Sequence, residues 1–142
     1  MKEKLKLLYG KDNTTTYRIL LELEASAADS DELYSYFDEL IEMLKHEKSS
    51  VRVRGFRLIC SLAKWDKKNK TNENIDTILD ELDDDISTSV RQCLNRLNIL
   101  LMYKPELSEN VEKKLKSLDV SKYKESMQSL INRDIEAILN SI

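Results

Sequence analysis

The sequence predicts an all-α fold, and three observations support that prediction. Only two glycines and one proline occur in 142 residues, and these residue types are the main breakers of regular backbone. Apolar residues recur at the spacing of one helix face, as from Val90 through Leu94 and Leu97 to Leu101. The same pattern returns along the chain. Since a chain of this length buries roughly 70% of its unfolded surface, we expect a single domain over residues 1–142.

The clearest repeat joins residues 49–65, "SSVRVRGFRLICSLAKW", to residues 87–103, "STSVRQCLNRLNILLMY". A shift of 39 positions aligns Val51 with Val90, Arg52 with Arg91, Arg57 with Arg96, Leu58 with Leu97 and Leu62 with Leu101. A shift of 38 aligns the preceding segments, Phe37, Leu40, Ile41 and Leu44 with Ile75, Ile78, Leu79 and Leu82. The extra residue falls in the turn, where exposed backbone tolerates insertions. The sequence therefore predicts a helix-turn-helix unit used twice, and Gly55, aligned with Leu94, predicts a close approach of a neighbouring helix.

Weaker copies flank these two units, so we expect four helix pairs, over residues 2–28, 31–66, 73–104 and 106–142. Residues that can cap a helix N-terminus precede the apolar segments: Asn13, Asp31, Ser50, Ser87, Ser108 and Ser121. The last helix is predicted to be the longest, with apolar residues from Tyr123 to Ile142. Because each unit has an apolar face that it cannot bury alone, such a helix would close the end of the stack.

Two stretches resemble HEAT repeats, "DISTSVRQCLNRLNILLM" from Asp85 to Met102 and "HEKSSVRVRGFRLICSLA" from His46 to Ala63. In that family the second helix typically opens with an aspartate in the turn, then Val-Arg, then small and apolar residues. The resemblance implies a short α-solenoid: an α-α superhelix of about four HEAT-like helix pairs in a right-handed, armadillo-like stack. Tetratricopeptide repeats have a similar length, but their Trp, Leu-Gly and Tyr signature positions are missing.

The resemblance also implies roles for several charged residues. In the family the Arg after Val reaches the turn aspartate of the same or an adjacent repeat, which implies a structural pair between Arg91 and Asp85. Since His46 occupies the corresponding position ahead of Arg52, this arginine is expected to turn to Asp84 or Asp85 of the next unit. The second helices of HEAT arrays line a concave face, so the residues expected there as partner contacts are Arg52, Arg57, Trp65, Arg91, Arg96, Asn98 and Lys124.

The residues also argue against an enzyme, a cofactor site or a metal site. His46 is the only histidine, Cys60 and Cys93 lie far apart among apolar residues, and both glycines are isolated. This excludes the usual zinc, disulfide, catalytic-triad and phosphate-loop patterns. The acidic run 80–85 lacks the spacing of a calcium loop, so we interpret it as a solvated helix end compensated by arginines of the adjacent unit.

We therefore expect a non-enzymatic protein-interaction or scaffold module that uses the concave face of the stack. The alternative is a nucleic-acid-binding protein with a basic concave strip, which the net charge of -3 disfavours. Trp65 either fills the space between two units or anchors a partner. The longest apolar run, residues 99–103, cannot span a membrane, and we expect a cytoplasmic protein with no membrane contact. Monomer and weak homodimer both stay open.

Overall fold

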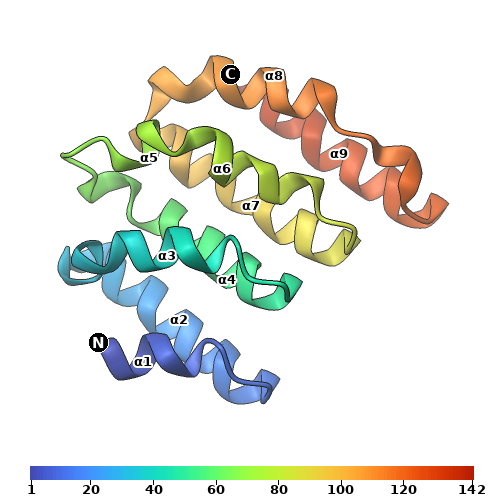
Figure 1. Ribbon diagram of the computed structural model, residues 1–142. Coiled ribbons are helices and arrows are strands. Elements are labelled where there is room, and N and C mark those ends of the chain that lie inside the picture. The colour runs from blue at the N-terminus through green and yellow to red at the C-terminus, as the bar shows by residue number, and fades with distance from the viewer.

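The computed structural model describes residues 1–142, and these residues form an all-helical structure without strands (Figure 1). Nine α-helices follow one another: α1 (Lys2–Leu7), α2 (Asn13–Asp29), α3 (Phe37–Met43), α4 (Ser49–Ser61), α5 (Lys70–Glu73), α6 (Ile75–Leu79), α7 (Ser87–Tyr103), α8 (Ser108–Ser117) and α9 (Glu125–Ser141). Short 3-10 segments extend several of them: η1 (Glu32–Tyr36), η2 (Ala63–Trp65), η3 (Asp80–Asp83), η4 (Pro105–Leu107) and η5 (Val120–Lys122).

The helices lie in two rows (Figure 1). Helices α2, α4, α7 and α9 pack side by side in chain order, and we call them the long-helix row. The shorter helices α1, α3, α6 and α8 cover one side of it, where α1 packs on α2 and α3 on α4. The chain thus consists of four helix pairs, each a short helix followed by a long one, over residues 2–29, 32–65, 70–103 and 105–141.

The repeated apolar positions form the inward face of the long helices. Val51 and Val90 are fully buried, and so are Leu58 and Leu97 at the next repeated position. They belong to a single core of 36 buried apolar residues that runs through all four pairs. Because apolar surface removed from water stabilises the fold by about 25 cal/mol per Å², this continuous core accounts for the packing of each pair on the next.

Gly55 lies at a close approach between α3 and α4. A Cβ atom at this position would be 2.9 Å from Cβ of Met43 and 3.1 Å from the carbonyl oxygen of Leu40. No side chain fits there without moving α3. The close helix approach predicted at Gly55 is therefore present, and the neighbour is the short helix of the same pair.

Several predictions about helix ends are wrong. Helix α9 is not the longest, because α2, α7 and α9 each have 17 residues. It begins at Glu125, so Tyr123 lies before the helix, although its ring is buried and its hydroxyl donates to the carbonyl oxygen of Asp84. The cap of α2 is Asp12, which accepts from the backbone N–H of Thr14 at 3.1 Å, and not Asn13.

The N-termini of α4 and α7 also differ from the prediction. Ser50 and Ser87 were expected to cap these helices, but Lys48 and Ile86 occupy the cap positions and provide no side-chain hydrogen bond. The first N–H groups of a helix have no partner within the helix. Two neighbouring long helices therefore begin with backbone donors that no side chain satisfies.

Candidate functional site

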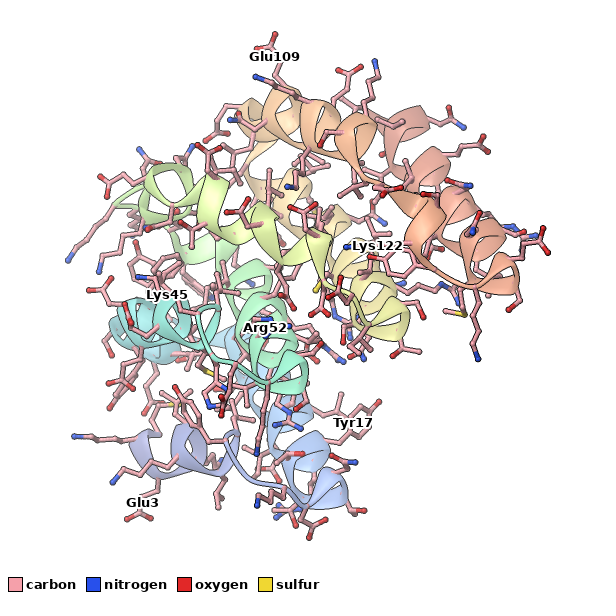
Figure 2. The ribbon with its side chains drawn as sticks, turned by 45° about the vertical axis from the view of Figure 1, so that its right-hand side comes forward. Glu3, Tyr17, Lys45, Arg52, Glu109 and Lys122 are labelled. Atoms are coloured by element: carbon pink, nitrogen blue, oxygen red, sulfur yellow. The ribbon has the colours of Figure 1, made fainter.

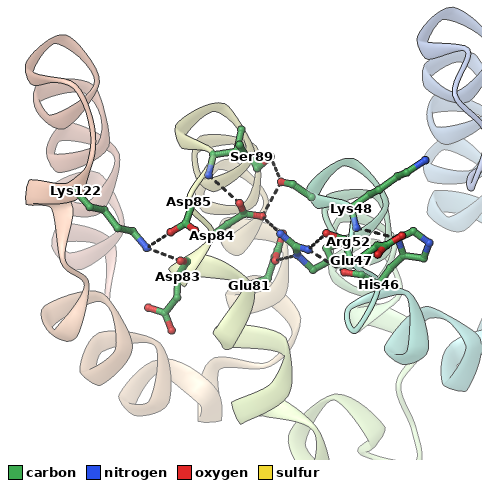
Figure 3. A network of polar contacts seen from close by, with 12 residues as sticks. His46, Glu47, Lys48, Arg52, Glu81, Asp83, Asp84, Asp85, Ser89 and Lys122 are labelled. Atoms are coloured by element: carbon green, nitrogen blue, oxygen red, sulfur yellow. Dashed lines mark hydrogen bonds and ion pairs between the residues drawn. The ribbon is translucent and has the colours of Figure 1, made fainter.

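Arg52 connects the second helix pair to the third (Figure 3). Its Nε donates to Oε1 of Glu81 at 2.9 Å, and its Nη2 donates to Oδ2 of Asp84 at 3.0 Å. Its Nη1 donates to the carbonyl oxygens of His46 and Glu47, both at 2.9 Å. This arginine therefore holds the turn between α3 and α4 and also the turn before α7. As expected, it contacts Asp84 of the next unit.

The two carboxylates that hold Arg52 have opposite protonation behaviour. Burial, together with the neighbouring Asp84 carboxylate, raises the pKa of Glu81 to about 8, and its Oε2 atom has no hydrogen-bond partner. Burial also acts to raise the pKa of Asp84, but the neighbouring Glu81 side chain and hydrogen bonds from Ile86 N–H and the Ser49 hydroxyl outweigh burial and lower it. At neutral pH, Asp84 is thus the charged partner of Arg52, whereas Glu81 is largely protonated.

Arg57 and Arg96, the repeated arginines, share one carboxylate on the long-helix row. Arg57 donates to both oxygens of Glu24 in α2, at 2.7 and 3.1 Å, and to Oε1 of Gln92 in α7 at 3.0 Å. Arg96 donates to the same Glu24 at 3.2 Å. Burial acts to raise the pKa of Glu24, but the hydrogen bonds from the two arginines outweigh it, so the pKa is lowered. The cluster ties α2, α4 and α7 together.

The pair predicted between Arg91 and Asp85 does not form. Arg91 donates from Nε to Oδ2 of Asp134 in α9 at 2.8 Å, and Asp85 instead accepts from Nζ of Lys122 at 3.2 Å. The reason is the packing of α9 on α7, which brings Asp134 to the face that carries Arg91. Asp85 lies in the turn before α7 and faces the segment before α9 (Figure 3).

The remaining predicted contact residues are spread over the molecule. Trp65 is partly buried at the junction of the first two pairs, where its Nε1–H donates to the carbonyl oxygen of Ala27 at 2.7 Å. Nζ of Lys64 lies over the indole ring, 4.9 Å from the ring centroid. Asn98 and Lys124 are exposed. The structure therefore gathers Arg57 and Arg96 in one cluster but places Asn98, Trp65 and Lys124 elsewhere.

A buried aspartate that the sequence did not single out organises the loop between the second and third pairs. Asp66 accepts from the hydroxyl of Tyr34 at 2.5 Å and from the backbone N–H groups of Lys70 and Thr71, both at 2.9 Å. Nζ of Lys104 lies 3.3 Å from its Oδ2. Burial and this carboxylate raise the pKa of Tyr34 to about 12. The only sequence signal for this site is an aspartate directly after the tryptophan that ends a unit.

An open groove of about 830 Å³ crosses the first turns of α2, α4 and α7. Leu20 and Val53 form its buried floor, and Tyr17 and Ile86, both at least half exposed, stand at its rim. Figure 2 shows Tyr17 projecting away from α2. Gln92 lines the groove and also accepts from Arg57, so the Glu24 cluster borders it. We call this the α2–α4–α7 groove.

Arg54 lines this groove and is the one buried charged side chain without a partner of opposite charge. It is 8% exposed, and its Nη1 donates to the carbonyl oxygen of Leu8 at 2.6 Å. It forms no ion pair, and burial alone lowers its pKa. The aligned position in the other copy is Cys93, so the repeat gave no reason to select Arg54.

The structure contains no cluster of three or more His, Cys, Asp or Glu side chains that could hold a metal ion. Both cysteines are buried and form no disulfide, and burial raises the pKa of each thiol, which makes them poor nucleophiles. None of the helices combines the length and the apolar character needed to cross a membrane.

Comparisons with protein-family models, with curated proteins and with solved structures find no match to this chain. The resemblance to HEAT repeats therefore rests on the residues of this chain alone.

Proposed function

We propose that this chain is a HEAT-like α-solenoid module that binds a segment of a partner protein in the α2–α4–α7 groove. The observation that carries the proposal is the groove itself, which is open, crosses three successive long helices and has exposed apolar residues at its rim. A shallow, extended surface of this kind suits a polypeptide better than a small substrate, which needs a more enclosed site.

The contacts between successive pairs support the solenoid part of the proposal. The long helices pack in chain order, and the aligned arginines Arg52 and Arg91 each bind a carboxylate of the following pair. Repeat proteins of this type are built from units that contact mainly their neighbours. The proposed binding surface lies on the long-helix row, as expected for a HEAT-like array, but near its helix N-termini.

The charges weigh against the nucleic-acid alternative. Arg52, Arg57, Arg91 and Arg96 each contact at least one carboxylate, so no arginine of the expected basic strip is unpaired, although Arg57 and Arg96 share Glu24. Phosphate-backbone binding depends on clusters of unpaired cations. Duplex DNA binding at low salt that is lost when these arginines are replaced by alanine would reverse this assignment.

The experiment that tests the proposal compares two double variants. Tyr17→Ala with Ile86→Ala removes the apolar rim of the groove, and Met102→Ala with Tyr103→Ala removes exposed apolar residues at the far end of α7. We expect affinity purification from the native cell to recover a stoichiometric partner with the wild type and the second variant, but not with the first. A photo-cross-linking residue at position 17 should capture that partner, and one at position 103 should not. Equal recovery by both variants would refute the groove as the binding surface.

A further inference from the structure

The lining of the α2–α4–α7 groove differs in charge from the rest of the molecule. The chain has 26 acidic and 23 basic residues. None of the 14 residues that line the groove is acidic, and two of them, Lys48 and Arg54, are basic. The Asp84 carboxylate, which accepts from the Ser49 hydroxyl at this end of the groove, is itself paired with Arg52. The lining residues therefore carry an excess of positive charge, which attracts anionic groups.

The buried guanidinium of Arg54 independently indicates an anionic ligand. Burying a guanidinium away from water is costly unless an anion accompanies it. Arg54 is more than nine-tenths buried, and one of its N–H groups is satisfied by the Leu8 carbonyl, but no carboxylate of the chain approaches it. Because Arg54 lines the groove, an anion bound in the groove could contact its remaining N–H donors and serve as the missing counter-ion.

Backbone donors strengthen the same end of the groove. Helices α4 and α7 have 13 and 17 residues, and both begin there without a side-chain cap. The N-terminus of a helix carries a partial positive charge and free N–H groups, which favour an anion. The exposed hydroxyl residues Ser50 and Thr88 in their first turns add further donors.

We infer that the groove takes an acidic peptide segment, with a carboxylate or phosphate group placed against Arg54 and the uncapped N-termini of α4 and α7. This inference rests on the proposed function and names the chemistry of its partner. A short acidic segment fits better than a nucleic acid, because only two cations line the groove while the chain as a whole has a net charge of -3, which repels a long polyanion.

The test uses the full chain and four pools of random peptides that differ in one fixed central residue: glutamate, phosphoserine, glutamine or lysine. Hydrogen bonds to charged groups contribute more than neutral ones, so peptides with a glutamate or phosphoserine centre should bind about tenfold or more tightly than those with glutamine. The comparison of glutamate with phosphoserine separates the two sources of the anionic group. Equal binding of glutamate and glutamine peptides would overturn the inference.

Variants connect the preference to Arg54. Arg54→Met should abolish the preference for acidic peptides while leaving binding of glutamine peptides in place, whereas Lys67→Ala, an exposed lysine outside the groove, should change neither. The double variant Ser50→Asp with Thr88→Asp tests the same preference without changing a buried residue, because both residues are exposed. Its added carboxylates should repel acidic peptides, so the preference for them should also be lost. A preference that survives both variants would contradict the inference.

Two further outcomes separate this inference from the proposed function. If all pools bind equally and binding is lost with Tyr17→Ala and Ile86→Ala, the protein-binding function stands and the acidic preference falls. If no pool binds, or binding survives that rim variant, the proposed function fails and the inference falls with it. Tight binding of a short single-stranded oligonucleotide that depends on Arg54 would assign the groove to nucleic acid instead.

Discussion

Two junctions of this molecule use ion pairs in different ways. The central junction, between the second and third helix pairs, is held by the ion pair of Arg52 with Asp84 and by the hydrogen bond from Arg52 to Glu81. The Glu81 and Asp84 side chains are 4% and 1% exposed. The C-terminal junction, between the third and fourth pairs, is held by Arg91 with Asp134 and Lys122 with Asp85. There the carboxylates are 24% and 92% exposed.

The difference follows from the position of each pair in the stack. The second and third pairs have neighbours on both sides, so polar groups between them are removed from water and need fixed partners. The fourth pair has one neighbour, and α9 is held mainly by its buried isoleucines, Ile131, Ile135 and Ile138. Removing one partner of a buried ion pair is strongly destabilising, whereas an exposed pair contributes little. The arginine of the repeated Val-Arg pair is therefore expected to contribute more to stability in the first copy, as Arg52, than in the second, as Arg91.

The largest effect is expected for Arg52→Ala. This change leaves the Asp84 carboxylate buried without its guanidinium and frees two backbone carbonyls, so the free energy of unfolding should fall by about 2–4 kcal/mol. Chemical denaturation, monitored by circular dichroism, measures this free energy. Arg52→Lys keeps the charge but not the forked geometry, so its free energy of unfolding should lie between those of the wild type and Arg52→Ala. A loss below about 0.5 kcal/mol for Arg52→Ala would show that the central junction does not depend on this network.

An intermediate effect is expected from the protonation of Glu81. Its pKa is about 8 in the folded protein against an ordinary value of 4.5, so folding favours the protonated form. The resulting stabilisation is complete below pH 4.5 and is lost as the pH rises towards 8. Its size should be on the order of a few kcal/mol, because each pKa unit corresponds to about 1.4 kcal/mol.

The measurement is the free energy of unfolding at several pH values between these limits, for the wild type and Glu81→Gln. Glutamine resembles the protonated carboxyl group but does not titrate, so the variant should show a flatter pH profile. The same slope in both proteins would mean that another group causes the pH dependence.

The smallest effects are expected at the C-terminal junction. Arg91→Ala should cost about 0.5–1 kcal/mol and Asp85→Ala less, because both pairs are partly or largely exposed and screened by salt. Thermal unfolding of the two variants beside Arg52→Ala gives the comparison directly. If Arg91→Ala destabilised the protein as much as Arg52→Ala, the two junctions would be energetically equivalent, which would contradict the expected difference.

The periodicity of apolar residues allowed much of the fold to be predicted. The helical spacing and the shifts of 38 and 39 positions located the paired segments, and the repeated positions Val51, Val90, Leu58 and Leu97 are buried as expected. The close approach at Gly55 was also visible, because a glycine replaced an apolar side chain at an aligned position. These features depend on backbone geometry and on burial, which a repeated sequence specifies locally.

Partners in ion pairs and the position of the groove could not be predicted in this way. Arg96 and Glu24 are 72 positions apart, and only the packing of α2, α4 and α7 brings them together. Arg54 has no repeated equivalent, so nothing in the alignment marked it as part of a groove. Uncapped helix ends were equally invisible, since serines were present where caps were expected.

The sequence by itself determined that this protein is helical, where its helices pair and which faces turn inward, because helix periodicity and the hydrophobic effect act on residues close in the chain. Tertiary structure alone decided which charges pair with one another and which buried charge, that of Arg54, has no partner of opposite sign. Electrostatic partners are chosen by distance in space and by exclusion of water, and both quantities are set only when distant helices pack together.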